Sequence, residues 1–140
     1  MHDPAPRADA PPARTTPAPT LSGWGRLPMP GREVLGESLE RVTRGAVLTR
    51  GLARSYGDAS LPAREDDKVV NTTLADRVLA FDAETGVLRV EAGLSLAEVN
   101  RLFMPLGWFT PVTPGTKFVT VGGMVASDVH GKNHHREGCF

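Results

Sequence analysis

Apolar residues recur along this chain at two different spacings, which predict a mixture of short strands and helices. Between residues 33 and 44, four apolar side chains return at the spacing of one helical face, so a helix is expected there, ending near Gly45. These side chains are Val34, Leu35, Leu39 and Val42. Two short apolar runs, 46–49 and 69–72, predict strands, the first of them buried.

Residues 78–81 and 87–90 predict the two arms of a β-hairpin. They flank a five-residue loop, DAETG, in which Gly86 can adopt a positive φ. Further along, Ser95 and Glu98 have the S-x-x-E spacing of a helix capping box. The helix expected after Ser95 ends near residues 105–107. It has four apolar residues on one face, namely Leu96, Val99, Leu102 and Phe103.

A further helix is expected to begin at Gly122 and Gly123 and to extend toward residue 129. The predicted strands and helices lack the regular alternation of a doubly wound sheet, so the expected fold class is α+β. Residues 1–20 are rich in proline and alanine, contain no large apolar residue after Met1, and predict a disordered tail. Residues 21–140 form the predicted folded domain.

Composition excludes several classes of function. The 16 Lys and Arg balance the 16 Asp and Glu, which leaves no basic surplus for nucleic acid. No apolar run approaches the roughly 18 residues of a membrane span, and no secretory or twin-arginine signal is recognisable. The single cysteine, Cys139, excludes an internal disulfide and has no predicted activating neighbour.

The segment RGLARSYGD, residues 50–58, is a candidate anion-binding loop. Gly51 and Gly57 allow backbone N–H groups to approach a ligand, and Arg50 and Arg54 add positive charge. An ordinary glycine-containing connection with two solvated arginines is the competing interpretation. Composition alone favours that competing interpretation.

Residues 114–123 form a second candidate. Gly122 and Gly123 at a helix start would present free N–H groups and the positive end of the helix to a phosphate. The pattern is not G-x-G-x-x-G, and the surrounding Rossmann unit is missing. A plain loop and a ligand-binding loop therefore fit the pattern equally well.

Three histidines lie near the end of the sequence with the spacing H-x3-H-H, at His130, His134 and His135. Gly131 interrupts any helix that could place them together, and only Asp128 and Glu137 supply carboxylates nearby. We therefore expect no metal site and favour histidines at the surface or beside a ligand. A metal-binding module is the remote alternative.

Three segments in the same order resemble the FAD-linked oxidases of the vanillyl-alcohol oxidase superfamily, and within it the group of decaprenylphosphoryl-β-D-ribose oxidases. They are RGLARSYGDAS (50–60), VEAGLSLAEVN (90–100) and PGTKFVTVGGMVASDVHGKNHH (114–135). The resemblance covers about residues 22–140. It implies an FAD-binding PCMH-type α+β domain, with the N-terminal subdomain and the start of the second.

The resemblance also implies which residues hold FAD. The first loop would wrap the pyrophosphate through its backbone, and Tyr56 and His130 would lie near the flavin and the substrate, with the catalytic residues otherwise unknown. The cofactor-binding residues it implies are Thr49, Arg50, Gly51, Leu52, Ala53, Arg54, Ser55, Tyr56, Gly57, Asp58, Ala59, Gly115, Thr120, Val121, Gly122, Gly123, Ser127, Asp128, Val129 and His130.

Three positions bear on how far the resemblance holds. Arg54 stands where many superfamily members carry the histidine that bonds covalently to flavin, so non-covalent FAD is expected. Ala53 replaces a glycine of the usual pattern, and a positive φ there would mean strain. Ser127 stands where close relatives often have cysteine.

The implied activity is oxidation of a sugar hydroxyl, namely the ribose 2′-OH of decaprenylphosphoryl-ribose to the 2′-keto form in arabinan and cell-wall precursor synthesis. A reductase partner would complete an epimerisation. The substrate domain of such enzymes has no counterpart here, so the chain is expected to be an inactive N-terminal fragment. The alternatives are a sugar-alcohol or aldonolactone oxidase and a non-catalytic remnant. A cytoplasmic location, or one peripheral to the cell membrane, is expected.

Overall fold

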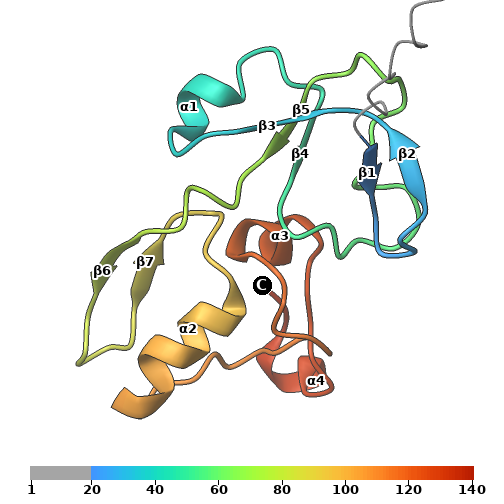
Figure 1. Cartoon of the computed structure of the whole chain (residues 1–140). Helices are drawn as coiled ribbons and strands as arrows, with labels where there is room; N and C mark the ends of the chain where they lie inside the picture. The colour runs from blue at the N-terminus through green and yellow to red at the C-terminus, as the bar shows by residue number, and fades with distance from the viewer. Residues whose placement is uncertain (1–19) are drawn as a thin grey trace, which may run out of the picture.

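The computed structural model describes residues 20–140, and the predicted disordered tail lies outside these residues except for Thr20. The elements are short and connected by long loops (Figure 1). In order they are β1 (Thr20–Ser22), β2 (Pro28–Pro30), β3 (Glu33–Leu35), α1 (Leu39–Val42), β4 (Leu48–Arg50), β5 (Val69–Asn71), β6 (Val78–Phe81), β7 (Leu88–Val90), α2 (Leu96–Phe103), the 3-10 turn η1 (Met104–Leu106), α3 (Val121–Ala126) and α4 (His134–Glu137).

The N-terminal half is built on a three-stranded parallel sheet in the order β3-β5-β4. The central strand β5 buries Val69 and Val70 completely, as expected for a strand with neighbours on both sides. β5 confirms the strand predicted at 69–72. β1 and β2 form a separate antiparallel pair beside this sheet, at the upper right of Figure 1.

The helix predicted over residues 33–44 is wrong for its first part. Residues 33–35 form β3, which pairs in parallel with β5 through the register Val34↔Val70. The helix within the predicted range is α1 alone, which is four residues long. Gly36 follows β3 directly. A side chain at this position would collide with the Val42 side chain, so the close approach of α1 requires glycine there. The helical spacing of apolar residues was thus overridden by pairing with a distant strand.

The strand predicted at 46–49 is displaced. β4 begins at Leu48, which is half-buried, while Val47 is exposed. β4 lies at an edge of the sheet, so one flank has no neighbouring strand to cover it.

The C-terminal half packs the antiparallel β6–β7 hairpin and α2 around the main hydrophobic core, which also takes in Met124 of α3 (Figure 1). The predicted hairpin is confirmed, with Gly86 at φ 74° and its loop one residue longer than expected. Trp108 packs over Gly86 and meets Phe81 edge-on at 5.9 Å. The buried core side chains are Leu94, Leu96, Val99, Phe103 and Met124.

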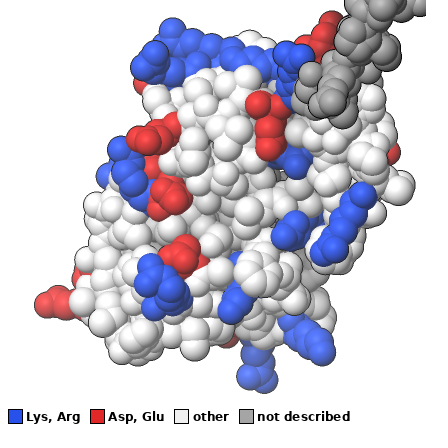
Figure 2. Space-filling model, viewed as in Figure 1, with Lys and Arg blue, Asp and Glu red and all other residues white. Residues whose placement is uncertain are grey.

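The cap predicted for α2 is also confirmed, since Ser95 Oγ accepts a hydrogen bond from the Glu98 N–H at 3.2 Å. The mixed strands and helices agree with the expected α+β class. Acidic and basic side chains are interspersed over the face shown in Figure 2, in keeping with the balanced composition. Within residues 20–140, no helix has the length and apolar character needed to cross a bilayer.

Candidate functional site: a cavity between two loops

A cavity of about 670 Å³ opens between the loop that follows β4 and the segment that leads into and out of α3. Its volume lies within the range of roughly 300–1,000 Å³ that is usual for sites of small molecules and cofactors. One wall is formed by residues 49–56, 59 and 60, and the other by residues 114–116, 119, 120, 123, 126, 127, 129 and 130. Two segments some sixty residues apart in sequence, each singled out as a candidate, therefore face one cavity.

The first wall has an unusual number of unused backbone donors. In the described chain, none of the ten N–H groups of residues 51–60 donates a hydrogen bond to another protein group. Ala53 and Gly57 have φ values of 54° and 59°, so the loop contains two left-handed residues. A left-handed residue next to a right-handed one turns neighbouring N–H groups toward the same side, which is the local geometry of anion-binding backbone turns.

Arg50 anchors this wall to the rest of the fold. Its guanidinium donates to the carbonyl oxygens of Ser60 and Ser22 at 3.0 and 3.1 Å, and Nε lies 3.3 Å from Glu33 Oε2. The Arg50 side chain is only 9% exposed. Because Glu33 offsets its charge, Arg50 fixes the loop in place and is a weaker ligand for an anion than the sequence suggested.

Arg54 is held differently. It is exposed, donates from Nη1 to the Leu52 carbonyl oxygen at 2.8 Å, and lies over the Trp24 ring with its Cζ 5.8 Å from the ring centroid. Trp24 comes from the turn between β1 and β2 and also lines the cavity. A residue far from the recognised loop thus supports one of its charged side chains.

The second wall is organised by Thr120, the buried N-cap of α3. Its Oγ1 accepts from the Gly123 N–H at 3.1 Å, while Val121 and Gly122 donate to the carbonyl oxygens of Leu94 and Ala92 at 2.8 Å. The N–H groups predicted to be free at this helix start are therefore already bonded within the protein, and that prediction is wrong. The free donors belong to the first loop instead.

The predicted site residues divide into two groups. Those that line the cavity are residues 49–56, Ala59, Gly115, Thr120, Gly123, Ser127, Val129 and His130. Those that do not line it are Gly57, Asp58, Val121, Gly122 and Asp128.

Sequence reasoning also missed part of the lining, namely Trp24, Ser60, Pro114, Thr116, Val119 and Ala126. Ser60 has particular interest, because it is 4% exposed and its Oγ has no hydrogen-bond partner among the described residues. The quoted segment RGLARSYGDAS already included Ser60, so its position in that segment was the available signal.

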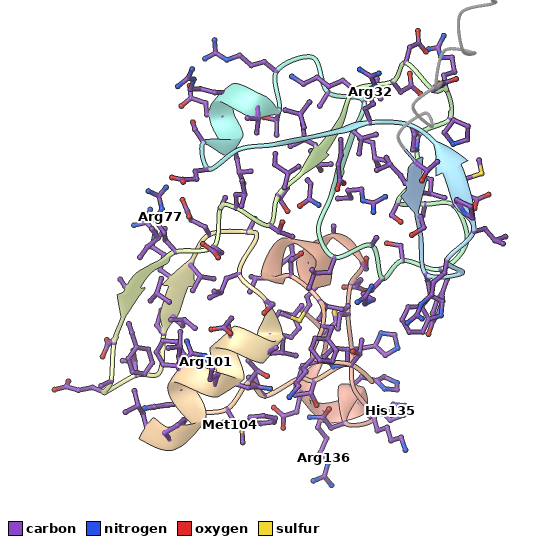
Figure 3. The ribbon with its side chains drawn as sticks, in the orientation of Figure 1. Arg32, Arg77, Arg101, Met104, His135 and Arg136 are labelled. Carbon is purple, nitrogen blue, oxygen red and sulfur yellow. The ribbon has the colours of Figure 1, made fainter. Side chains whose placement is uncertain are left out.

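Tyr56 and His130 occupy the two walls with exposed side chains, Tyr56 being 83% exposed. The histidine rings gather near the C-terminal end: His134 lies 5.3 Å from His130 and 3.9 Å from His135, centroid to centroid. His135 comes from α4 at the lower right of Figure 3. Within residues 20–140, no set of three or more His, Cys, Asp or Glu side chains is arranged to hold a metal ion.

Cys139 lies close to Asp128, which has a left-handed φ of 48°. The neighbouring Asp128 carboxylate raises the pKa of the Cys139 thiol, because it interacts more favourably with the protonated thiol than with the thiolate. A thiol with a raised pKa is a poorer nucleophile at neutral pH, because less of it is ionised. Cys139 is also absent from the lining of the cavity.

Comparison with known proteins gives concordant results. The family model described as "FAD binding domain" matches residues 40–140. Decaprenylphosphoryl-beta-D-ribose oxidase of Mycolicibacterium smegmatis (strain ATCC 700084 / mc(2)155) is 39% identical over 141 aligned residues, which cover 90% of this chain and 30% of that protein. D-lactate dehydrogenase of Anaerostipes hadrus is 31% identical over 71 residues, covering 51% of this chain and 15% of that protein.

Among solved structures, an alkyldihydroxyacetonephosphate synthase superposes with a TM-score of 0.63 at 21% identity, over 76% of this chain and 22% of that chain. At this level of identity, the likeness shows a shared fold. The chain spans less than a third of the length of each of these relatives.

Proposed function

This chain belongs to the FAD binding domain family, and from that premise we propose that the cavity between the two loops is the place where FAD binds. The family is one of FAD-dependent oxidoreductases, which the names of its relatives reflect. The chain itself supplies binding and orientation, while bound FAD supplies the acceptor for a hydride.

The run of ten unbonded N–H groups in residues 51–60 carries this proposal. FAD contains a diphosphate, and backbone N–H groups that are unbonded within the protein are well suited to its oxygens. The unpartnered Ser60 hydroxyl adds a donor in the same wall. The residues present therefore fit the cofactor.

Each of the other residues has a proposed role that follows from its place. Thr120 and Gly123 close the second wall against the first, and Gly115 leaves room for the ligand, since a Cβ there would meet nothing within 4 Å. Tyr56 and His130 are proposed to lie beside the flavin and the substrate, because they bring exposed polar side chains to the cavity.

We further propose that the complete oxidase acts on a hydroxyl group of a sugar, and specifically that it resembles decaprenylphosphoryl-ribose oxidase in its substrate. The support is the 39% identity that extends over nine-tenths of this chain. A reductase partner that completes an epimerisation belongs to the same proposal.

The cofactor proposal is tested by titrating the full chain with FAD and following flavin fluorescence together with amide hydrogen exchange. Saturable 1:1 binding is expected, with the N–H groups of residues 51–60 gaining protection. Riboflavin, which lacks the diphosphate, serves as the matched ligand and should bind at least about tenfold more weakly, the equivalent of about 1.4 kcal/mol. Equal affinity for the two ligands, or no change in the exchange of residues 51–60, would contradict the proposal.

A further inference from the structure

A second cavity, of about 570 Å³, adjoins the first and contains a different set of charged groups. It is lined by three arginines, Arg26, Arg50 and Arg54, and by no acidic residue. Trp24 and Phe118 provide aromatic surfaces in the same lining. A group of arginines without lining carboxylates favours an anionic ligand, because guanidinium groups present several donors to oxygen.

The three arginines do not contribute equally. Arg50 is committed to Glu33 and to two carbonyl oxygens, so it adds little free charge. Arg54 uses one nitrogen for the Leu52 carbonyl and keeps its other donors. No ion pair within residues 20–140 includes Arg26. The available positive charge therefore comes from Arg26 and Arg54.

Backbone strain points to the same cavity. Only three residues other than glycine have a left-handed φ in the described chain, and two of them, Arg26 at 57° and Ala53 at 54°, line this cavity. Such conformations cost of order 1 kcal/mol and tend to concentrate where a ligand is bound. The strain at Arg26 arises in the turn closed by its N–H bond to the Gly23 carbonyl at 3.1 Å.

We propose that this second cavity is a binding site for an anionic oxygen group such as phosphate, held by Arg26 and Arg54 next to the cofactor cavity. The two cavities share part of their lining, including Trp24, Ala53 and Arg54, so a ligand in one abuts a ligand in the other. The anion has two possible sources, the cofactor's own diphosphate or an anionic group of the substrate. The binding of an anion in this cavity does not depend on the proposed function. The choice between the two sources does, because it assumes that FAD occupies the first cavity.

The test uses inorganic phosphate as the probe and backbone amide NMR shifts of the full chain as the readout. Without FAD, phosphate should shift the amides of Gly23, Arg26 and Phe118 saturably. Arg26→Gln should weaken that affinity about three- to tenfold, the range expected for losing a charged donor near the surface. Arg32→Gln is the matched control, because Arg32 lines neither cavity and lies at the top of Figure 3, and it should leave the affinity unchanged.

A second arm identifies the source of the anion. If FAD-saturated protein still shows the phosphate shifts at Gly23 and Phe118, the site accepts an anionic group of the substrate. If FAD abolishes them and Arg26→Gln weakens FAD binding, the site holds part of the cofactor. Absence of saturable shifts at these amides, or equal phosphate affinity in the wild-type and Arg26→Gln proteins, overturns the proposal. Failure of FAD to bind would count against the proposed function alone, because the phosphate arm needs no flavin.

Discussion

Gly51 packs against Thr120 so closely that a methyl group at position 51 would overlap the Thr120 side chain. Gly51 begins the loop that carries the unbonded N–H groups, and Thr120 is the buried N-cap of α3. This contact joins the two walls of the first cavity at one point. The separation of the walls is therefore set by the absence of a single side chain.

Gly51→Ala should both destabilise the fold and weaken FAD binding. The added methyl must displace Thr120, which strains the packing and disturbs its bond to the Gly123 N–H. We expect a loss of about 1–3 kcal/mol in the free energy of unfolding, measured by urea denaturation. FAD affinity should fall in parallel titrations.

Gly25→Ala is the control for this substitution, since a Cβ at Gly25 would meet nothing within 4 Å and its φ is not left-handed. It should change the unfolding free energy by less than about 0.5 kcal/mol. If the two alanine variants prove equally stable, the walls are not joined through Gly51 and Thr120.

Ala53→Gly should stabilise the protein, in contrast to most substitutions by glycine. Ala53 has a φ of 54°, which costs a residue with a Cβ about 1–2 kcal/mol. Glycine removes that cost but adds about 0.5–1 kcal/mol of entropy to the unfolded chain. A net gain of up to about 1.5 kcal/mol is expected in the same denaturation assay.

The comparison for Ala53 is Ala63→Gly, at an exposed position without a left-handed φ. There only the entropy of the unfolded chain changes, so a loss of about 0.5–1 kcal/mol is expected. The two substitutions should therefore have opposite signs. A loss of stability in both would show that the loop relaxes around Ala53 without strain.

The stability of the protein in acid should depend on Glu91. Arg77, labelled in Figure 3, donates to this carboxylate from its side chain and its backbone N–H, and the pKa of Glu91 falls from 4.5 to about 2. Because the folded pKa is the lower one, the unfolded chain binds the extra proton between these values. The stabilisation by this pair is present above pH 4.5 and is lost as the pH falls toward 2.

Glu91→Gln should accordingly flatten the decline of unfolding free energy between pH 4.5 and 2, as followed by circular dichroism in urea. Glu65→Gln removes a carboxylate that belongs to no ion pair of residues 20–140, and it should retain the wild-type slope. A wild-type slope in the Glu91→Gln protein would mean that the pair with Arg77 does not persist in solution.

Bound FAD should be released by acid precipitation, with the yellow flavin found in the supernatant. Position 54 carries an arginine, whose guanidinium lies over Trp24 and is no nucleophile toward flavin. The histidine in the lining of the cavity, His130, belongs to the opposite wall. Flavin retained in the washed pellet, measured by absorbance near 450 nm in the denatured protein, would contradict non-covalent binding.

Local signals in the sequence predicted the elements that form from neighbouring residues. The β6–β7 hairpin closes over six residues with Gly86 at its turn, and α2 begins at its own Ser95 cap. β3 could not be predicted in this way, because its extended state depends on pairing with β5, more than thirty residues later. Short elements gain most of their stability from such tertiary partners.

The site shows the same division. The glycines of the first loop pointed to backbone donors, and the N–H groups of residues 51–60 are indeed unbonded within the described chain. The glycine pair at α3 gave the same signal, yet the carbonyl oxygens of Ala92 and Leu94 already accept hydrogen bonds from this helix start. The position of Trp24 in the cavity lining could not be predicted for a different reason. Trp24 belongs to the separate β1–β2 hairpin and reaches the cavity only in the folded protein.

The first loop presents its main chain as the donor surface, and this has a consequence for how the protein can vary. A side chain in residues 51–60 can be exchanged without deleting any N–H group, provided that the backbone keeps its course and no proline enters. The backbone N–H groups that contact a ligand and the side chains of the same loop can therefore change independently of each other. A position such as Tyr56, whose side chain is exposed, is free to tune selectivity while the backbone N–H groups of the loop are retained.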